Sequence, residues 1–394
     1  MGDFRFLPFL GDFAPERIEF ILLAKHIFSS RYYKKHSAIS DEQFGLNEVT
    51  PVNSWSQLKA ISGGNALLKL INFGNAKKFV KFLRTVVGSF PPKKLPLDDA
   101  VKWAVDIQLK QGIDLVSDGE QRTDMTSYFG SLPGLGSKPG GPYVKSRILP
   151  LENPKDFVKL QDLAFVRDYL RSKGREDVKA KVSITGPVTL GFSCAYNGLE
   201  HYSSIRDMKL YSDFAQALNP LIKEIAKTGC HVQIDEPSLS ARVMNTKEAV
   251  EIVNEALSDL PTTLYEEGKV SVHICGAFNE PLFNDFMNLD APILSLAFSA
   301  QNVRRNLEVV SKRILQSGQK KLGVGCVSVQ AARKEEVEKL DAVIGRIETI
   351  KDRIGKEMIA FLHPDCGLRN TAEEAVEPIL EVLASSASSL EKDG

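Results

Sequence analysis

The chain has 394 residues, and its 50 Lys and Arg residues balance 50 Asp and Glu residues, so the formal net charge is zero. This balance argues against a nucleic-acid-binding protein, which would carry a clear excess of basic residues. No apolar run reaches the roughly 20 residues of a membrane-spanning helix, and acidic residues interrupt the N-terminal apolar stretch, so we expect no membrane span and no signal peptide. Five cysteines, an odd number, argue against a disulfide framework and favour the cytoplasm.

Residues 1–80 lack the pattern that the rest of the chain shows. Apolar residues recur with helical spacing over 15–29 and again over 66–83. These patterns predict a mostly helical N-terminal extension, residues 1–80, in front of a domain that covers 81–394. The basic aromatic segment 31–35 is either an RNA-binding patch or, more simply, the solvated end of a helix.

From residue 84 onward, short apolar runs alternate with amphipathic helical patterns. The apolar runs cover residues 85–87, 114–116, 182–184, 231–234, 270–275, 292–296, 321–324 and 358–362. The helical patterns cover residues 97–111, 155–173, 202–227, 246–258, 303–317, 334–354 and 371–384. Eight strand-like runs that alternate with helices predict an α/β fold, the (β/α)8 TIM barrel. A doubly wound open sheet is the alternative, but no glycine-rich nucleotide loop follows the first run. A glycine- and proline-rich loop, 130–154, is long enough to indicate a functional or mobile segment.

The strand-like run 270–275 carries His273 and Cys275 on one face, because alternate side chains of a strand point the same way. Such a pair more often serves packing than metal binding. A barrel, however, gathers the carboxyl ends of its strands at one rim, and this places Cys366, after the last run, near the pair. Two thiolates and an imidazole are three ligands of a zinc site whose fourth position is open, as in catalytic sites. Zinc of this kind holds an incoming thiol as the thiolate, ready for alkyl transfer.

Three polar residues at other strand ends suit an amino-acid substrate. Glu120 and Asp235 could accept hydrogen bonds from its ammonium group, and Ser89 could hold its carboxylate. Two alternatives stay open: either acidic residue could cap the following helix, and Glu120 could form a structural ion pair with Arg122.

The remaining cysteines and histidines fit structural roles more simply. Cys194 and Cys230 are expected to pack as small apolar side chains, and His231 opens a strand far from the rim. Cys326 ends the seventh run, where a role in the site is an alternative to packing. His363 precedes Pro364 near the rim, where a place behind the site is an alternative to a purely structural role.

Six segments together resemble the catalytic barrel of cobalamin-independent methionine synthase, in the order of that family. They begin at Thr85 (TVVGSFP), Ser117 (SDGEQRTDM), Ile184 (ITGPVT), Gln233 (QIDEP), His273 (HIC) and Pro364 (PDCGL). The resemblance covers residue 84 to the end and implies a zinc-dependent barrel that methylates homocysteine. It implies that His273, Cys275 and Cys366 are zinc ligands, and that Ser89, Glu120 and Asp235 bind homocysteine.

The sequence departs from the family pattern at the rim. The family's fourth zinc ligand is a glutamate, and Ala297 stands at that place. Ser328 and Gln330 stand where the family has an aspartate and, in full-length members, a histidine. The chain is also too short for the second, N-terminal barrel of those members. It therefore resembles the short core form, for which the donor would be methylcobalamin or a corrinoid protein, with methyltetrahydrofolate as the alternative.

We therefore expect a homocysteine S-methyltransferase in methionine biosynthesis. A barrel enzyme for a different thiol is one alternative. The other is a non-catalytic homologue that depends on a partner subunit, with an altered zinc site.

Overall fold

The computed structural model describes residues 81–392 of the chain. The predicted helical extension, 1–80, lies outside these residues and stays a prediction. Of the helical pattern 66–83, only 81–83 are described, and they carry no helix, so the pattern was extended too far at that end.

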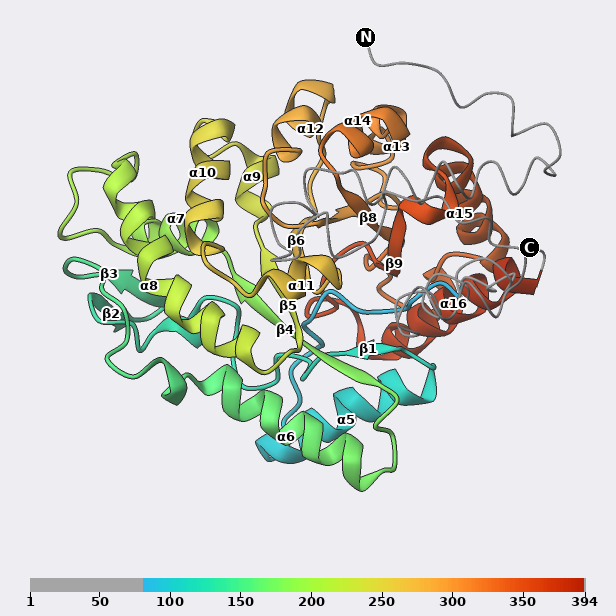
Figure 1. Cartoon of the computed structure of the whole chain (residues 1–394). Helices are drawn as coiled ribbons and strands as arrows, with labels where there is room; N and C mark the ends of the chain where they lie inside the picture. The colour runs from blue at the N-terminus through green and yellow to red at the C-terminus, as the bar shows by residue number, and fades with distance from the viewer. Residues whose placement is uncertain (1–80, 393–394) are drawn as a thin grey trace, which may run out of the picture. The chain divides into compact units, whose positions relative to one another are not determined.

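A parallel sheet forms the centre of the described region, with its strands in the order β1-β4-β5-β6-β7-β8-β9 (Figure 1). The strands are β1 (Leu115–Val116), β4 (Lys179–Thr185), β5 (His231–Asp235), β6 (Val270–Ile274), β7 (Ile293–Ala297), β8 (Lys321–Val327) and β9 (Ile359–Pro364). Each strand pairs in parallel with the next one along the chain. This is the sequential order of a barrel and excludes the doubly wound alternative, whose strand order reverses.

The segment at Arg84 and Thr85 closes this sheet into a barrel. Arg84 bridges Leu362 of β9, and Thr85 bridges Leu115 of β1, both in parallel. The first predicted strand, 85–87, is therefore present only as two bridges. The side chain of Asp114 accepts hydrogen bonds from the backbone and guanidinium of Arg84, which holds this closing segment at the start of β1. The fold is thus an α/β barrel, as the alternation of strands and helices predicts.

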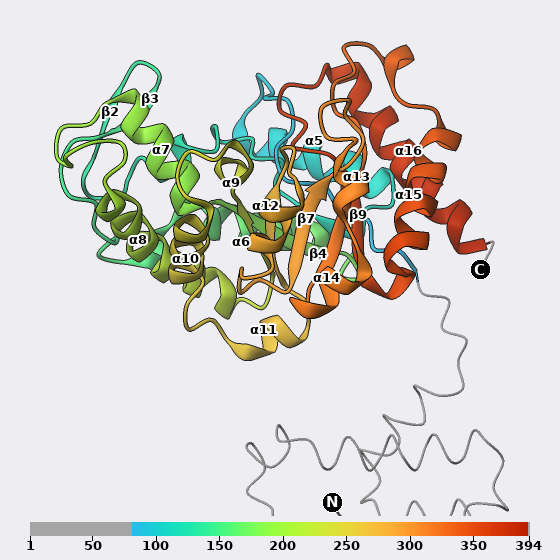
Figure 2. The same cartoon turned by 90° about the horizontal axis from the view of Figure 1, so that it is seen from above.

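Helices surround the barrel and depart from the predicted ranges in several places (Figure 2). They are α5 (Leu97–Lys110), α6 (Val158–Ser172), α7 (Pro187–Asn197), α8 (Met208–Lys227), α9 (Pro237–Ala241), α10 (Thr246–Ala256), α11 (Thr262–Glu266), α12 (Glu280–Phe286), α13 (Asn306–Val309), α14 (Lys312–Ser317), α15 (Leu340–Ile354) and α16 (Glu373–Lys392). The predicted helix 303–317 is two short helices, because Ser311 is extended and caps α14 with its side chain. The predicted helices 202–227 and 334–354 begin later, and α16 continues beyond residue 384. Helices α7, α9, α11 and α12 were not predicted.

The loop after β1 is less irregular than its composition suggests. It contains an antiparallel hairpin of β2 (Leu135–Lys138) and β3 (Gly141–Val144), with short 3-10 turns at Ser127–Phe129 and Pro154–Asp156. The hairpin packs beside α7, as Figure 1 shows. This loop leaves the carboxyl end of its strand, so it belongs to the rim at which barrel active sites lie.

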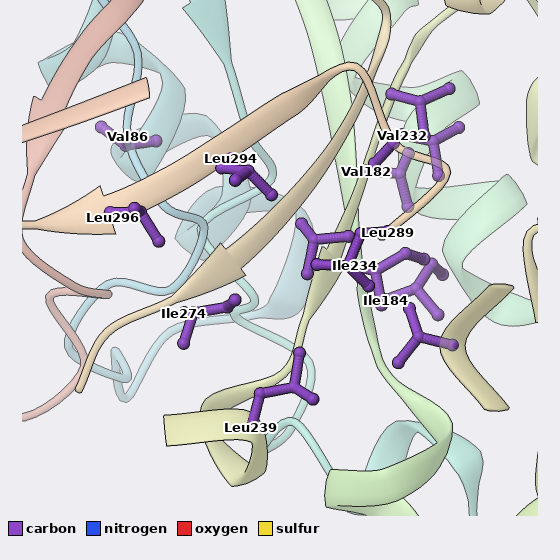
Figure 3. Packing of buried hydrophobic residues seen from close by; sticks show 14 of the residues in the cluster. Val86, Val182, Ile184, Val232, Ile234, Leu239, Ile274, Leu289, Leu294 and Leu296 are labelled. Atoms are coloured by element: carbon purple, nitrogen blue, oxygen red, sulfur yellow. The ribbon is translucent and has the colours of Figure 1, made fainter. Parts of the chain in front are cut away.

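Alternate residues of the barrel strands have opposite character. The even-numbered ones are apolar and mostly buried, and Ile184, Ile234 and Leu294 are fully buried among the surrounding side chains (Figure 3). Each such side chain contributes about 1.5–3 kcal/mol by leaving water. The odd-numbered ones are largely polar, and those that face the barrel interior bond to one another, as described below. Within residues 81–392, no helix combines the length and the apolar character that crossing a bilayer requires.

Candidate metal centre and active site

Three candidate metal ligands meet at the carboxyl-end rim. His273 lies near the end of β6, Cys275 follows it, and Cys366 follows β9. One ligand atom from each of the three lies within 4.8 Å of the other two. Closure of the barrel brings these residues together, because β7 and β8 separate their strands in the sheet.

The donor atoms of this cluster suit a metal such as zinc. The Nδ1 atom of His273 bonds to Ser295 Oγ at 3.0 Å, while its buried Nε2 atom has no hydrogen-bond partner among residues 81–392. A hydrogen bond between the two thiols lowers the pKa of Cys275 and raises the pKa of Cys366. An imidazole nitrogen beside two thiols, one of which has a lowered pKa, matches the His and Cys ligands that zinc prefers.

No carboxylate completes this set from the end of β7. Ala297 is buried there, on the same strand face as Ser295, whose hydroxyl bonds to His273. Asp365 is close in sequence to Cys366, but its carboxylate accepts backbone hydrogen bonds from Phe298, Ser299 and Ala300. The Asp365 carboxylate therefore holds the loop after β7, and its oxygens are occupied by these backbone hydrogen bonds.

Ser89 lies beside the segment that carries Cys366. The backbone N–H of Leu368 donates to the Ser89 carbonyl at 2.7 Å. A Cβ atom added to Gly367 would come within 2.2 Å of Ser89 Oγ. Glycine at 367 leaves room for this hydroxyl, so Ser89 lies against the residue that follows Cys366.

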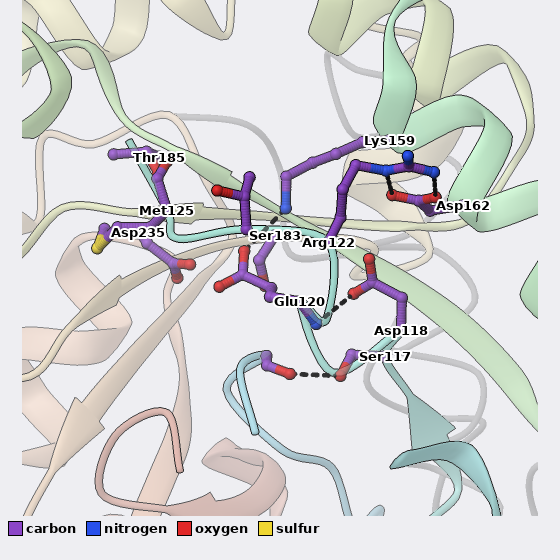
Figure 4. Close-up of polar contacts among 12 residues, drawn as sticks. Ser117, Asp118, Glu120, Arg122, Met125, Lys159, Asp162, Ser183, Thr185 and Asp235 are labelled. Atoms are coloured by element: carbon purple, nitrogen blue, oxygen red, sulfur yellow. Dashed lines mark hydrogen bonds and ion pairs between the residues drawn. The ribbon is translucent and has the colours of Figure 1, made fainter. Parts of the chain in front are cut away.

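Glu120 is held in an unusual backbone conformation at the same rim. Its φ of 49° lies in the left-handed region, which costs a non-glycine residue about 1–3 kcal/mol and is typical of functional sites. Its Oε1 atom accepts a hydrogen bond from Lys159 Nζ at 2.8 Å, and the side chains are only 8% and 2% exposed. Arg122 pairs with Asp162 instead (Figure 4), so the predicted alternative of a Glu120–Arg122 pair is wrong.

Lys159 belongs to α6 and is fully enclosed. Burial alone would lower its pKa, but the carboxylates of Glu120 and Asp118 outweigh that effect and raise it. Its ammonium also lies over the ring of Tyr128, 3.9 Å from the centroid. The region around Glu120 therefore contains a permanent positive charge that the sequence did not predict.

Asp235 is the last residue of β5, and two successive hydrogen bonds from side chains inside the barrel hold its carboxylate. Gln233 Nε2 donates to Asp235 Oδ1 at 2.7 Å, and Lys181 Nζ donates to Gln233 Oε1 at 2.7 Å. Burial raises the pKa of Asp235 to about 6 and lowers the pKa of Lys181 to about 7. Asp235 does not cap the following helix α9, because the N-cap residue of α9 is Glu236, and its side chain makes no cap hydrogen bond there. The Glu236 carboxylate instead accepts hydrogen bonds from the first backbone N–H groups of α7.

Three further cysteines and two further histidines lie inside the described barrel domain. Cys194, Cys230 and Cys326 are buried, and Cys326 bonds weakly to the carbonyl of His363. His231 bonds to Ser271 inside the barrel. His363 bonds to Ser295 Oγ at 2.9 Å, and its ring makes a T-shaped contact with the ring of His273, with 5.8 Å between the centroids. It therefore lies behind the site.

The fold and the site together define the class of protein: an α/β barrel with a thiolate- and imidazole-rich centre at its carboxyl-end rim. The model of the family "Cobalamin-independent synthase, Catalytic domain" matches residues 89–389. The chain belongs to this family.

Individual relatives agree with that assignment. The methionine synthase of Methanothermobacter marburgensis is 30% identical over 312 residues, which cover 78% of this chain and 94% of the relative. That of Methanocaldococcus jannaschii is 28% identical and is covered to 92%. Among solved structures, a B12-independent methionine synthase from a Shewanella species, in complex with selenomethionine, has a TM-score of 0.63 at 20% identity, with 80% of this chain and 99% of that chain covered. This last likeness supports the barrel fold.

Proposed function

We propose that this chain is a zinc-dependent methyltransferase that converts homocysteine to methionine. The observation that carries the proposal is the meeting of His273, Cys275 and Cys366 within 4.8 Å. Family membership supports methyl transfer to homocysteine as the general reaction. Bound zinc would supply a Lewis acid that keeps the substrate sulfur deprotonated at neutral pH.

Three residues around the cluster would bind the amino-acid part of homocysteine. Lys159 donates to Oε1 of Glu120, so the substrate ammonium would approach Oε2, with Asp235 as a second acceptor. Ser89, held beside Gly367, would donate its hydroxyl to the substrate carboxylate. These contacts would orient the sulfur toward the two cysteines and the free nitrogen of His273.

The methyl transfer itself needs a donor from outside this site. The substrate sulfur forms a bond to the methyl carbon while the bond from that carbon to the donor breaks. The electron pair of the broken bond leaves with the donor. Methylcobalamin, a methylated corrinoid protein and methyltetrahydrofolate are the candidate donors.

Metal analysis of the purified full-length chain is the first test, followed by activity with each donor. We expect about one zinc per chain, since one cluster of this kind lies within residues 81–392. Cys366→Ala should lose zinc and turnover together. Cys230→Ala, which removes a buried thiol elsewhere, is the matched control and should keep both.

Retained turnover in Cys366→Ala would contradict the proposed chemistry. Zinc binding with turnover of another thiol, and none of homocysteine, would favour the enzyme for a different substrate. Turnover only after a second protein is added would favour the partner-dependent homologue.

A further inference from the structure

A chain of buried hydrogen bonds leads from the metal cluster across the barrel interior. His273 Nδ1 bonds to Ser295 Oγ at 3.0 Å, and Ser295 Oγ bonds to His363 Nε2 at 2.9 Å. His363 Nδ1 then bonds to the backbone carbonyl of Pro364 at 2.6 Å. The three side chains come from β6, β7 and β9 and are at most 2% exposed.

The donor and the acceptor of each hydrogen bond in this series follow from the last bond, which His363 makes to the Pro364 carbonyl. A carbonyl oxygen only accepts, so His363 must carry its proton on Nδ1. The ring is fully buried, and its printed hydrogen bonds go to a hydroxyl and a carbonyl rather than to a carboxylate. A buried charge without a counter-charge is costly, so the ring is neutral and its Nε2 atom is an acceptor. Ser295 has one hydroxyl proton and must donate it to His363.

The same reasoning continues to the metal cluster. Because the proton of Ser295 is engaged, its oxygen accepts from His273, and His273 must carry its proton on Nδ1. The Nε2 atom of a neutral His273 is then an unprotonated lone pair. This is the nitrogen that is buried without a partner among the described residues.

We propose that Ser295 and His363 are positioning residues that hold His273 in the tautomer that can bind a metal through Nε2. The inference rests on the proposed zinc site, and it adds two residues that contact neither the metal nor the substrate. Without Ser295, the proton of His273 would be free to move to Nε2 and block the lone pair. Outer hydrogen bonds of this kind typically change metal affinity by about 10- to 100-fold.

The barrel contains a matched control for this role. Ser271 also lies inside the barrel, is fully buried, and bonds to a histidine, His231, at 2.8 Å. His231 is outside the metal cluster. Ser271→Ala therefore removes the same kind of buried hydrogen bond as Ser295→Ala, but the lost bond ends at His231 and not at His273.

The tautomer can be measured on the full-length, metal-free chain by ¹⁵N NMR of its histidine side chains. The chain has six histidines, and a His273→Gln variant assigns the relevant signals. In the wild-type chain we expect His273 to be protonated on Nδ1 and unprotonated on Nε2. In Ser295→Ala the Nε2–H form should increase, whereas Ser271→Ala should leave His273 unchanged.

Zinc affinity, measured by competition with a chelator, is the second readout. Ser295→Ala should weaken zinc binding about 10- to 100-fold, and Ser271→Ala should stay within about twofold. His363→Gln keeps an acceptor for Ser295 and a donor for Pro364, so it should retain most of the affinity. Wild-type His273 with its proton on Nε2, or Ser295→Ala with unchanged zinc affinity, would overturn the inference. A wild-type chain that binds no zinc would contradict the proposed function, while the NMR result would still decide whether the tautomer is fixed.

Discussion

The buried ion pair of Lys159 and Glu120 makes a sharp prediction about stability. Its atoms are 2.8 Å apart, and both side chains are almost fully enclosed. Lys159→Met keeps the length and the apolar stem of the side chain but leaves the Glu120 carboxylate without its cation. Loss of one partner of such a pair costs about 3–5 kcal/mol, because the remaining charge stays buried.

This cost translates into a measurable change in melting temperature. A folded body of this size has an unfolding entropy of about 0.65 kcal/mol/K, so Lys159→Met should lower the Tm by about 5–8 °C. Thermal unfolding at one fixed scan rate measures this. The double variant Glu120→Gln with Lys159→Met removes both charges and should recover most of the loss. A Tm of Lys159→Met within about 1 °C of the wild-type value would show that the pair is not buried in the way described.

Two further predictions concern the closure of the barrel and the position of Ser89. Hydrogen bonds from Arg84 outweigh burial and lower the pKa of Asp114 below its usual 3.8. Its contribution is therefore present above about pH 4 and is lost as the pH falls through the lowered value. Asp114→Asn should cost about 1.5–3 kcal/mol at pH 7, and denaturant unfolding should show this deficit vanish in acid; a pH-independent deficit would contradict it. Gly367→Ala should displace Ser89 Oγ and raise the KM for homocysteine several-fold without loss of zinc. The control Gly345→Ala, where the added methyl meets nothing within 4 Å, should leave the KM unchanged, and equal KM values in the two variants would argue against a role for Ser89.

The sequence predicted the barrel because its signals are local. Apolar runs and helical periodicity repeat in each unit, and the order of units determines the parallel topology. The helix boundaries were less predictable. At Ser311 a cap divides one helical pattern into two helices, and at 84–85 two bridges replace the strand that the apolar run indicated.

The candidate site was predictable as far as strand ends determine it. A parallel barrel brings these ends together whatever lies between them, so Ser89, Glu120, Asp235 and the three metal-site residues could be grouped from their positions alone. The residues that bond to these site residues could not be predicted from the sequence. Lys159 meets Glu120 across 39 positions of the chain, and Ser295 meets His363 across 68. Such contacts depend on which face of a helix packs against the barrel and on the register in which the strands pair.

The polar residues of the inner strand faces are one further signal in the sequence. In β4, Lys181 and Ser183 alternate with apolar residues, although the strand is buried on both faces. Water cannot satisfy polar groups in such a place, so each needs a partner inside the barrel. Lys181 donates a hydrogen bond to the side chain of Gln233, and Ser183 donates one to the carbonyl of Val87. An apolar interior would stabilise a barrel with fewer constraints. The hydrogen-bonded interior instead orients the two rim side chains that it contacts, because Gln233 bonds to Asp235 and Ser295 bonds to His273.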